Sequence, residues 1–293
     1  MLTRHATHTT RYRLTALALG GAVAGIPMPS AGADALPLWE LRLGVAGASV
    51  PYYRGSEQTH NYTLPLPYVI YRGERVRVGD DGVKGLLVDR KTIIVDISLA
   101  AGLPARSDEH SPRVGMPELD PTLEFGPSLK VQLSRDETYN TSFWLNLPVR
   151  AMTSFDNFDP HGHGTVFAPH VDVIKQFRHV RAAFTAGPVF ASRAYHSYYY
   201  DVDEQYATAT RPEYHAGAGY SGTRVSFNLR QRDKTTWWGF FLRYDFLDGA
   251  VFANSPLMQQ ERYPVVGFVA TWQLYASSTP ARRAEDPLEA LNR

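Results

Sequence analysis

Long runs in which apolar and polar residues alternate one by one constrain the fold of this chain more than any other feature. In residues 139–151 the odd positions are mainly apolar and the even positions mainly polar. The same alternation recurs within 91–102, 118–134, 213–230 and 236–248. Successive side chains of a β-strand point to opposite faces of a sheet, so these runs predict strands with one apolar and one polar face.

The length of the runs favours a membrane barrel over a soluble sandwich, which would also alternate. Several runs span about 13 to 17 residues, whereas a soluble strand usually has about 5 or 6. The apolar set persists along the whole run, as a face in contact with lipid requires. Because backbone polar groups must all be paired inside lipid, such strands have to close on themselves. We therefore expect an all-β fold, a transmembrane antiparallel up-and-down β-barrel.

We count twelve strands in a barrel over residues 34–275, at 40–52, 60–72, 74–80, 83–89, 91–102, 118–134, 138–153, 163–177, 180–193, 213–230, 236–248 and 263–275. Ten strands with one folded-over hairpin is the alternative, because Gly79, Gly82 and Gly85 interrupt the third and fourth strands. The long connections are 53–59, 103–117, 154–162, 194–212 and 249–262. All of them fall at one end of such a barrel, as the long outer loops of outer-membrane barrels do.

The first residues are typical of an export signal. Arg4, Arg11 and Arg13 give a basic start without acidic residues, and an apolar stretch at 14–26 follows. Small residues at 31–33 then favour cleavage, so we assign residues 1–33 to a signal peptide. The apolar stretch is too short to span a membrane as a helix. The last residues, 276–293, are predicted to form a polar tail in the periplasm.

Composition narrows the function classes. Hydrophobic residues make up 44% and aromatic residues 12% of the 293 residues, which suits strands and membrane interfaces. There is no cysteine, so the sheet has to hold the fold together without disulfides. Without the signal peptide the net charge is about −2, which argues against a nucleic-acid partner.

The polar set of the alternation contains ten charged residues that we expect to face the lumen. A basic side chain exposed to lipid at the bilayer midplane would cost about 2–4 kcal/mol. The set consists of Arg42, Asp96, Glu124, Lys130, Arg150, Asp172, Arg224, Arg230, Arg243 and Asp245. One interpretation is a structural network of paired charges that fills a narrow barrel. The alternative is a polar channel with a mild preference for anions, which loop 103–117 or 194–212 could plug.

Five tyrosines gather in the longest predicted outer loop: Tyr195, Tyr198, Tyr199, Tyr200 and Tyr206. They are interpreted as an aromatic girdle or an internally packed loop. The functional alternative is an outer contact surface for a ligand or partner, because tyrosine brings a large area at a low entropy cost.

Histidines invite a metal interpretation that we do not adopt. His161, His163 and His170 lie near Asp156 and Asp159, but the His-Gly-His-Gly segment is predicted to be a solvated outer turn. No metal, cofactor or catalytic residue is assigned. The sequence lacks the His-x-Ser-Asn-Gly run of barrel phospholipases, and it has no phosphate-binding glycine loop. We therefore expect a protein that is not an enzyme.

Four segments, in order along the chain, resemble the MipA/OmpV family of outer-membrane proteins. They are 44–56 (GVAGASVPYYRGS), 66–73 (LPYVIYRG), 199–202 (YYDV) and 244–257 (YDFLDGAVFANSPL). The resemblance implies an outer-membrane barrel with a scaffolding, adhesion or small-solute role. The family has no agreed catalytic residues, so none are transferred. One departure is that the chain runs on past Tyr275, whereas such barrels commonly end on an aromatic residue.

The resemblance also implies partners and a location. Its first-named member is a scaffold for a murein-degrading transglycosylase, so we expect contact with a murein hydrolase or synthase in the periplasm and with lipid of the outer membrane of a Gram-negative bacterium. A narrow channel for small solutes is the first alternative. A surface adhesin that uses the tyrosine-rich outer loops is the second.

Overall fold

The computed structural model describes residues 36–74, 76–79, 82–85, 88–89, 92–105, 107, 111–156, 159–233 and 235–281. The predicted signal peptide and most of the predicted tail lie outside these residues, so both remain predictions. Within the described part of the chain, no helix is both long enough and apolar enough to cross a membrane.

The described chain is almost entirely strand. The strands are β1 (Trp39–Pro51), β2 (Thr59–Arg72), β3 (Val76–Gly79), β4 (Gly82–Gly85), β5 (Val88–Asp89), β6 (Ile93–Gly102), β7 (Thr122–Asp136), β8 (Thr141–Asp156), β9 (Asp159–Phe167), β10 (His170–Phe177), β11 (Val180–Ala191), β12 (Gly219–Arg232), β13 (Thr236–Phe246) and β14 (Arg262–Ala276). Between β11 and β12 lie the helix α1 (Arg193–Tyr200) and a 3₁₀ turn (Glu204–Tyr206).

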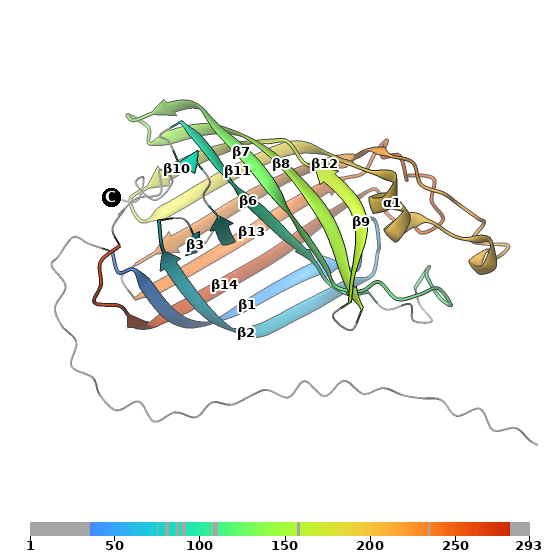
Figure 1. The fold of residues 1–293 in the computed structure, drawn as a ribbon, viewed down its shortest axis with the longest axis horizontal. Helices are drawn as coiled ribbons and strands as arrows, with labels where there is room; N and C mark the ends of the chain where they lie inside the picture. Colours follow the sequence, from blue (N-terminus) through green and yellow to red (C-terminus); the bar gives the residue numbers. More distant parts are fainter. Residues whose placement is uncertain are drawn as a thin grey trace, which may run out of the picture. The chain divides into compact units, whose positions relative to one another are not determined.

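The strands form one up-and-down antiparallel sheet that closes into a barrel (Figure 1). Neighbouring strands in the sequence pair with each other, and β1 pairs with β14 along most of its length. The remaining gap is closed by β4 and β5, two pieces of one interrupted strand. β4 pairs with β3, whereas β5 pairs with β6. β4 also lies beside β6. The predicted transmembrane barrel fold is therefore confirmed.

A second interrupted strand explains why fourteen segments make twelve barrel strands. β9 and β10 both lie between β8 and β11 and pair with both of them. The break falls at Ala168 and Pro169, because proline has no backbone N–H to donate to a neighbouring strand. The predicted count of twelve is thus confirmed, and β3 and β4 form a true hairpin.

Two predicted boundaries are wrong. The segment 154–162 was expected to be a long loop, but β8 continues to Asp156 and β9 already begins at Asp159. Its glycine and histidine, Gly162 and His161, resemble turn residues, yet both pair across the strands with β8. Conversely, β12 begins at Gly219 rather than at 213, because Tyr214 pairs with Val202 in the preceding loop.

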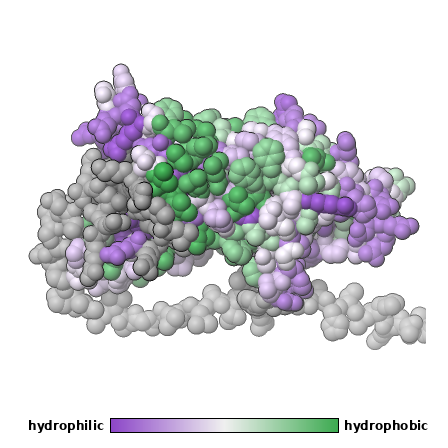
Figure 2. Space-filling model, turned by 45° about the horizontal axis from the view of Figure 1, so that its top comes forward, coloured by the Kyte–Doolittle hydropathy of each residue, from purple (hydrophilic) through white to green (hydrophobic). Residues whose placement is uncertain are grey.

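Apolar side chains cover the outer face of the barrel. Figure 2 shows a wide hydrophobic zone with hydrophilic residues on either side of it. Large exposed side chains from many strands form it, among them Leu43, Phe125, Phe184, Phe227 and Phe268. Water would disfavour so much contiguous apolar surface, whereas a lipid bilayer matches it. The alternation in the sequence therefore separates a lipid-facing set from a lumen-facing set.

The two ends of the barrel differ. We call the end where β1 begins and β14 ends the terminal end, and the opposite end the loop end. The connections β2–β3, β7–β8, β10–β11 and β12–β13 at the terminal end are short, whereas most of those at the loop end are long. The chain stays paired slightly beyond β14, since Pro280 bridges Pro37 and the N–H of Ala281 donates to Leu36. The predicted tail thus begins within a paired segment.

Candidate functional site

The predicted charged residues face the lumen, but they form separate groups rather than one network. The most deeply buried are Arg42, Asp96 and Asp245, each at most 1% exposed. Their lipid-facing neighbours along the strands are exposed, so the inward direction of the charged set follows from the strand geometry. Burial of charge is tolerated here because oppositely charged or polar partners lie within reach.

The group at the terminal end centres on Glu40, which the sequence analysis did not single out. Arg42 Nη2 lies 2.8 Å from Glu40 Oε2, and Arg72 Nη2 lies 2.6 Å from Glu40 Oε1. All three side chains are nearly fully buried. Glu40 stands two positions before Arg42 in the alternation, which was the signal available in the sequence. Arg72 instead resembled a turn residue because Gly73 follows it.

Three further groups lie along the wall formed by β6 to β11. Lys130 Nζ lies 2.6 Å from Asp96 Oδ2, and Arg150 Nε donates to Glu124 Oε2 at 2.9 Å. Within the part of the chain that the structure describes, the carboxylate of Asp172 is held by polar side chains instead. It accepts hydrogen bonds from Asn146 Nδ2 and Thr185 Oγ1, at 2.6 and 2.5 Å. These pairs hold neighbouring strands in register from the inside.

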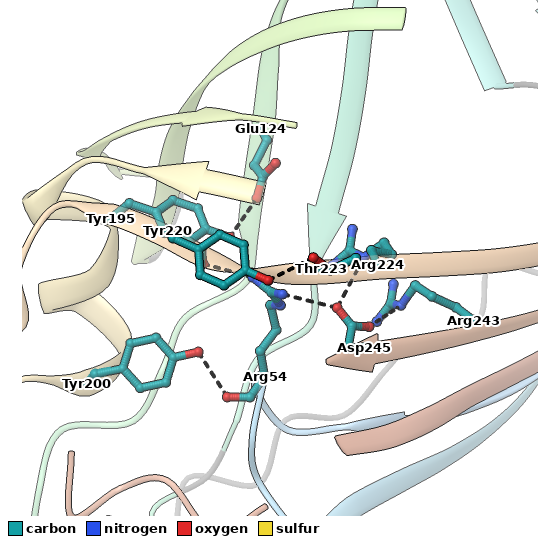
Figure 3. Close-up of polar contacts among 10 residues, drawn as sticks. Arg54, Glu124, Tyr195, Tyr200, Tyr220, Thr223, Arg224, Arg243 and Asp245 are labelled. Carbon is teal, nitrogen blue, oxygen red and sulfur yellow. Dashed lines mark hydrogen bonds and ion pairs between the residues drawn. The ribbon is translucent and has the colours of Figure 1, made fainter. Parts of the chain in front are cut away.

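The densest group, shown in Figure 3, surrounds Asp245 near the loop end. Arg243 Nε lies 2.7 Å from this carboxylate, and Arg224 Nε and Arg54 Nη2 lie 3.2 Å from it. Asp245 itself is fully buried. Arg54 comes from the loop between β1 and β2, so no periodicity in the sequence could identify it. One carboxylate therefore faces three guanidinium groups.

A hydrophobic cap forms the loop end. We define it as the segments that connect β1–β2, β6–β7, β11–β12 and β13–β14. Their buried core, together with the adjoining end of β14, consists of Tyr53, Ala105, Met116, Leu119, Tyr200, Val202, Ala216, Leu247, Ala250, Phe252, Leu257, Tyr263 and Val265. Such packing makes these long connections part of the folded core.

Helix α1 joins this cap to one wall of the lumen. Tyr195 Oη donates to Glu124 Oε1 at 3.1 Å on β7, and Tyr199 Oη lies 3.5 Å from Met152 Sδ on β8. On the other side, Tyr200 Oη donates to the carbonyl oxygen of Arg54 at 2.9 Å, and its ring stacks on Phe252 at 3.8 Å. The helix thus links β7 and β8 to the connections β1–β2 and β13–β14 of the cap.

The tyrosines proposed as an outer contact surface are mostly internal. Tyr195 and Tyr200 are buried, and Tyr198, Tyr199 and Tyr206 are partly buried. Burial raises the pKa of Tyr199 and Tyr200, since the charged phenolate is disfavoured away from water. Their hydroxyl groups therefore stay protonated. Tyr195 and Tyr200 therefore match the interpretation of this segment as an internally packed loop.

Two arginines tie the loops of the cap together. Arg211 Nη1 donates to the carbonyl oxygens of Pro112 and Val114, at 2.8 and 2.9 Å, and Arg211 Nη2 donates to that of Tyr206 at 2.7 Å. Arg113 Nη1 donates to the carbonyl oxygen of Tyr199 at 3.0 Å. Planar guanidinium groups suit such multiple bonds to backbone oxygens.

The structure does not bring the histidines of the discarded metal hypothesis together. His163 Nε2 lies 2.8 Å from Ser154 Oγ, whereas His170 Nδ1 bonds to the carbonyl oxygen of Ala168 at 2.8 Å. Across the described residues, no group of three or more His, Cys, Asp or Glu could hold a metal ion.

Between these groups the lumen contains a cavity of about 930 Å³. Its lining includes Lys130, Asp172 and Arg230 of the predicted set, together with aromatic and aliphatic side chains from β1, β2, β13 and β14. Several of the predicted lumen charges thus border a partly open cavity. No sequence signal had indicated its apolar side.

Comparison with protein families shows to which family this chain belongs. Residues 43–274, which include nearly the whole barrel, match the family described as MltA-interacting protein MipA. The chain belongs to the MipA family. The predicted resemblance is therefore confirmed, and it supports a MipA-type protein of the outer membrane. No curated protein matches this MipA-family chain.

Solved structures add no further argument. A chain described as a bacterial polysaccharide outer membrane secretin is 10% identical, with a TM-score of 0.39, and covers 83% of this chain and 100% of its own. The Ralstonia pickettii toluene transporter TbuX is 9% identical, with a TM-score of 0.28, and covers 82% of this chain and 75% of its own. At these scores the likeness carries no conclusion about function.

Proposed function

We propose that this MipA-family barrel is a non-catalytic scaffold of the outer membrane that holds a murein-processing enzyme of the periplasm at its terminal end. The match to a family described as MltA-interacting protein carries this proposal. The apolar outer face supports the membrane location, because it offers a bilayer the surface that a bilayer requires.

The terminal end suits a docking role by its construction. Its connections are tight turns, and outer-membrane barrels direct their short turns toward the periplasm. Arg178 and His179 form one of these turns, between β10 and β11, and both side chains are exposed. A rigid turn fixes its side chains before a partner arrives, which lowers the entropy cost of binding.

Site-specific photo-crosslinking tests the scaffold role. A photoreactive phenylalanine analogue replaces His179 at the terminal end, and in a matched control it replaces Glu213, which is exposed at the loop end. After irradiation of living cells, we expect a murein-processing enzyme in the crosslinked product of the His179 variant only. Recovery of no such enzyme from either position would refute the proposal. Equal recovery from both would refute the assignment to the terminal end.

A narrow channel for small solutes is the second candidate, and the lumen cavity favours it. Against it stands α1, which links the wall at β7 to the cap at the loop end through Tyr195 and Tyr200. Planar-bilayer recordings distinguish the two roles. We expect the purified barrel to be silent, and stable single-channel steps would support the channel instead. Because the same two tyrosines are buried, we do not extend the adhesin hypothesis.

A further inference from the structure

We propose that the wall of this barrel has a lateral opening beside β2, through which a small uncharged, lipid-soluble molecule enters the lumen cavity from the bilayer and binds there. The cavity of about 930 Å³ lies in the usual size range of ligand pockets, about 300–1,000 Å³. This inference goes beyond the scaffold role and does not depend on it.

The sheet is incomplete on one side of β2. Strand β1 pairs with β2 from Thr59 to Tyr71. By contrast, β3 pairs only with Tyr71 and Arg72 and then turns back as β4, so these short strands close the wall toward the terminal end only (Figure 1). Within the described part of the chain, residues 59–67 of β2 have a neighbouring strand on one side alone. We call the stretch of wall beside these residues the seam.

Two prolines disfavour closure of the seam by another strand. The backbone N–H of Arg72 donates to Leu38 on the β1 side, and successive residues of a strand direct their N–H groups alternately to the two sides. Positions 65 and 67 therefore direct their backbone nitrogens to the seam, and both residues are proline, which has no N–H to donate. Proline is typical of such edge strands.

The seam lies at the height of the bilayer. Pro65 and Pro67 stand opposite Val45 and Leu43 of β1, and Leu43 belongs to the hydrophobic zone of the outer face. The segment 61–70 (NYTLPLPYVI) contains no charged residue. A molecule dissolved in the lipid therefore meets an apolar border where β2 ends the sheet.

The same stretch of β2 lines the lumen cavity with its inner face. Tyr62, Leu64 and Leu66 border the cavity, and so does Leu103, which directly follows β6. Leu64 points inward and is nevertheless 58% exposed, more than the lipid-facing Leu43 at 47%. Since no strand flanks Leu64 on the seam side, the cavity and the seam are continuous at this residue.

The wall next to the seam is apolar and aromatic. Phe241 of β13 and Val269 of β14 line the cavity, and the ring of Tyr68 stacks on that of Trp237 with 5.7 Å between their centroids. Water in contact with such a surface is unfavourable, and an apolar ligand would displace it. Flat rings offer a ligand with an aromatic ring a surface on which to stack.

The charged side chains of the lining already have partners. Lys130 is paired with Asp96, Asp172 accepts two hydrogen bonds, and Arg181 and Arg230 each interact with other groups. An ionised ligand would lose its hydration in the cavity without gaining a counter-charge. The lining therefore favours an uncharged ligand.

Photolabelling of the full barrel in phosphatidylcholine vesicles tests the site. The probe is trifluoromethyl-phenyl-diazirine, an uncharged lipid-soluble molecule, and its benzoate derivative is the charged comparison. Because the probe also labels the lipid face, the readout is labelling of Leu64 and Phe241 that excess naphthalene competes away, located by mass spectrometry. Ala46→Phe fills the cavity from the inner face of β1, and the matched control Ala270→Phe adds the same ring on the lipid face of β14.

We expect naphthalene at about ten times its dissociation constant to lower labelling of the two lumen residues about tenfold, by mass action, and to leave the lipid face unchanged. Ala46→Phe should abolish the competed labelling, and Ala270→Phe should not. Absence of competed labelling in the lumen, the same labelling in folded Ala46→Phe, or equal competed labelling by the benzoate would overturn the site.

The lateral route is tested with single thiols, since the chain has no native cysteine. Pro65→Cys places a thiol at the seam, and the control Phe184→Cys places one on the lipid face of β11. After modification with pyrenyl maleimide, competed labelling of Phe241 should be lost in the first variant and kept in the second. Unmodified Pro65→Cys should label as the wild type does. Labelling that persists with the seam obstructed would overturn the route, and heat-dependent migration on SDS gels confirms that each barrel is folded.

Discussion

Asp245 is the residue on which the junction between cap and barrel depends. Its carboxylate is fully buried and lies within 3.2 Å of Arg54, Arg224 and Arg243. Arg54 belongs to the cap, and the other two arginines belong to the wall. Removing one member of a buried ion pair leaves uncompensated charge, which costs far more than the pair contributes.

Asp245→Asn should therefore destabilise the barrel by about 3–5 kcal/mol, because three guanidinium groups lose their shared counter-charge. Urea unfolding of the barrel refolded into lipid vesicles measures the change. The matched control is Asp248→Asn, whose partner Arg262 is exposed, so solvent already screens that pair and little change is expected. If the two substitutions lowered the free energy of unfolding equally, the buried Asp245 group would contribute no more to stability than the exposed pair does.

His196 makes the cap sensitive to pH. Burial lowers the pKa of this imidazole, which has Nδ1 bonded to the carbonyl oxygen of Gly217 and packs against Phe252. Unfolded histidine titrates near pH 6.5, so the unfolded cap takes up the proton first. The contribution of neutral His196 to stability is thus present above about pH 6.5 and is lost as the pH falls through the lower pKa of the folded state.

Hydrogen exchange of the α1 amides, corrected for intrinsic rates, should accordingly show weaker protection at about pH 5 than at about pH 7.5. His196→Gln removes the titrating group and should make protection independent of pH over this range. If the wild type and the variant respond alike, another group is responsible.

The strands were far more predictable than the connections between them. Alternation identified twelve strands, because a lipid face and a lumen face impose period two on every residue between them. α1 was missed because RAYHSYYY has few strong helix formers, although Ser192 is a standard N-cap. Its helical state depends on tertiary packing of Tyr195 and Tyr200. Likewise Arg54 and Arg113 lie in loops, where no period marks an inward direction.

The loops of the cap should open when their arginine clamp is removed. Arg211→Ala deletes the hydrogen bonds to the carbonyl oxygens of Pro112, Val114 and Tyr206, which hold the two loops together. We expect new protease cleavage in the loops between β6 and β7 and between β11 and β12, with the barrel strands still intact. Arg211→Lys should rescue only partly, since an ammonium group lacks the planar fork. An uncut Arg211→Ala variant would contradict the clamp role.

At the scale of the whole molecule, the two faces of the wall should respond oppositely to charge. Phe227 points to the outside in the middle of β12, whereas its neighbour Asn228 lines the lumen cavity. Phe227→Arg should cost about 2–4 kcal/mol in vesicles, and Asn228→Arg should cost much less. Urea unfolding in vesicles compares them. Equal costs, or a wild-type chain recovered dissolved in the periplasm, would contradict a barrel that spans the membrane.

The pairing of β1 with β14, continued by Pro37 and Pro280, affects the order in which the strands can follow one another along the polypeptide. Because the first and the last strand are hydrogen-bonded neighbours, the fold itself requires no particular strand to come first in the sequence. Leu36 and Ala281 share a backbone hydrogen bond, and a short peptide could join them. A circularly permuted gene that starts at the tight turn after Arg178 should then encode the same barrel.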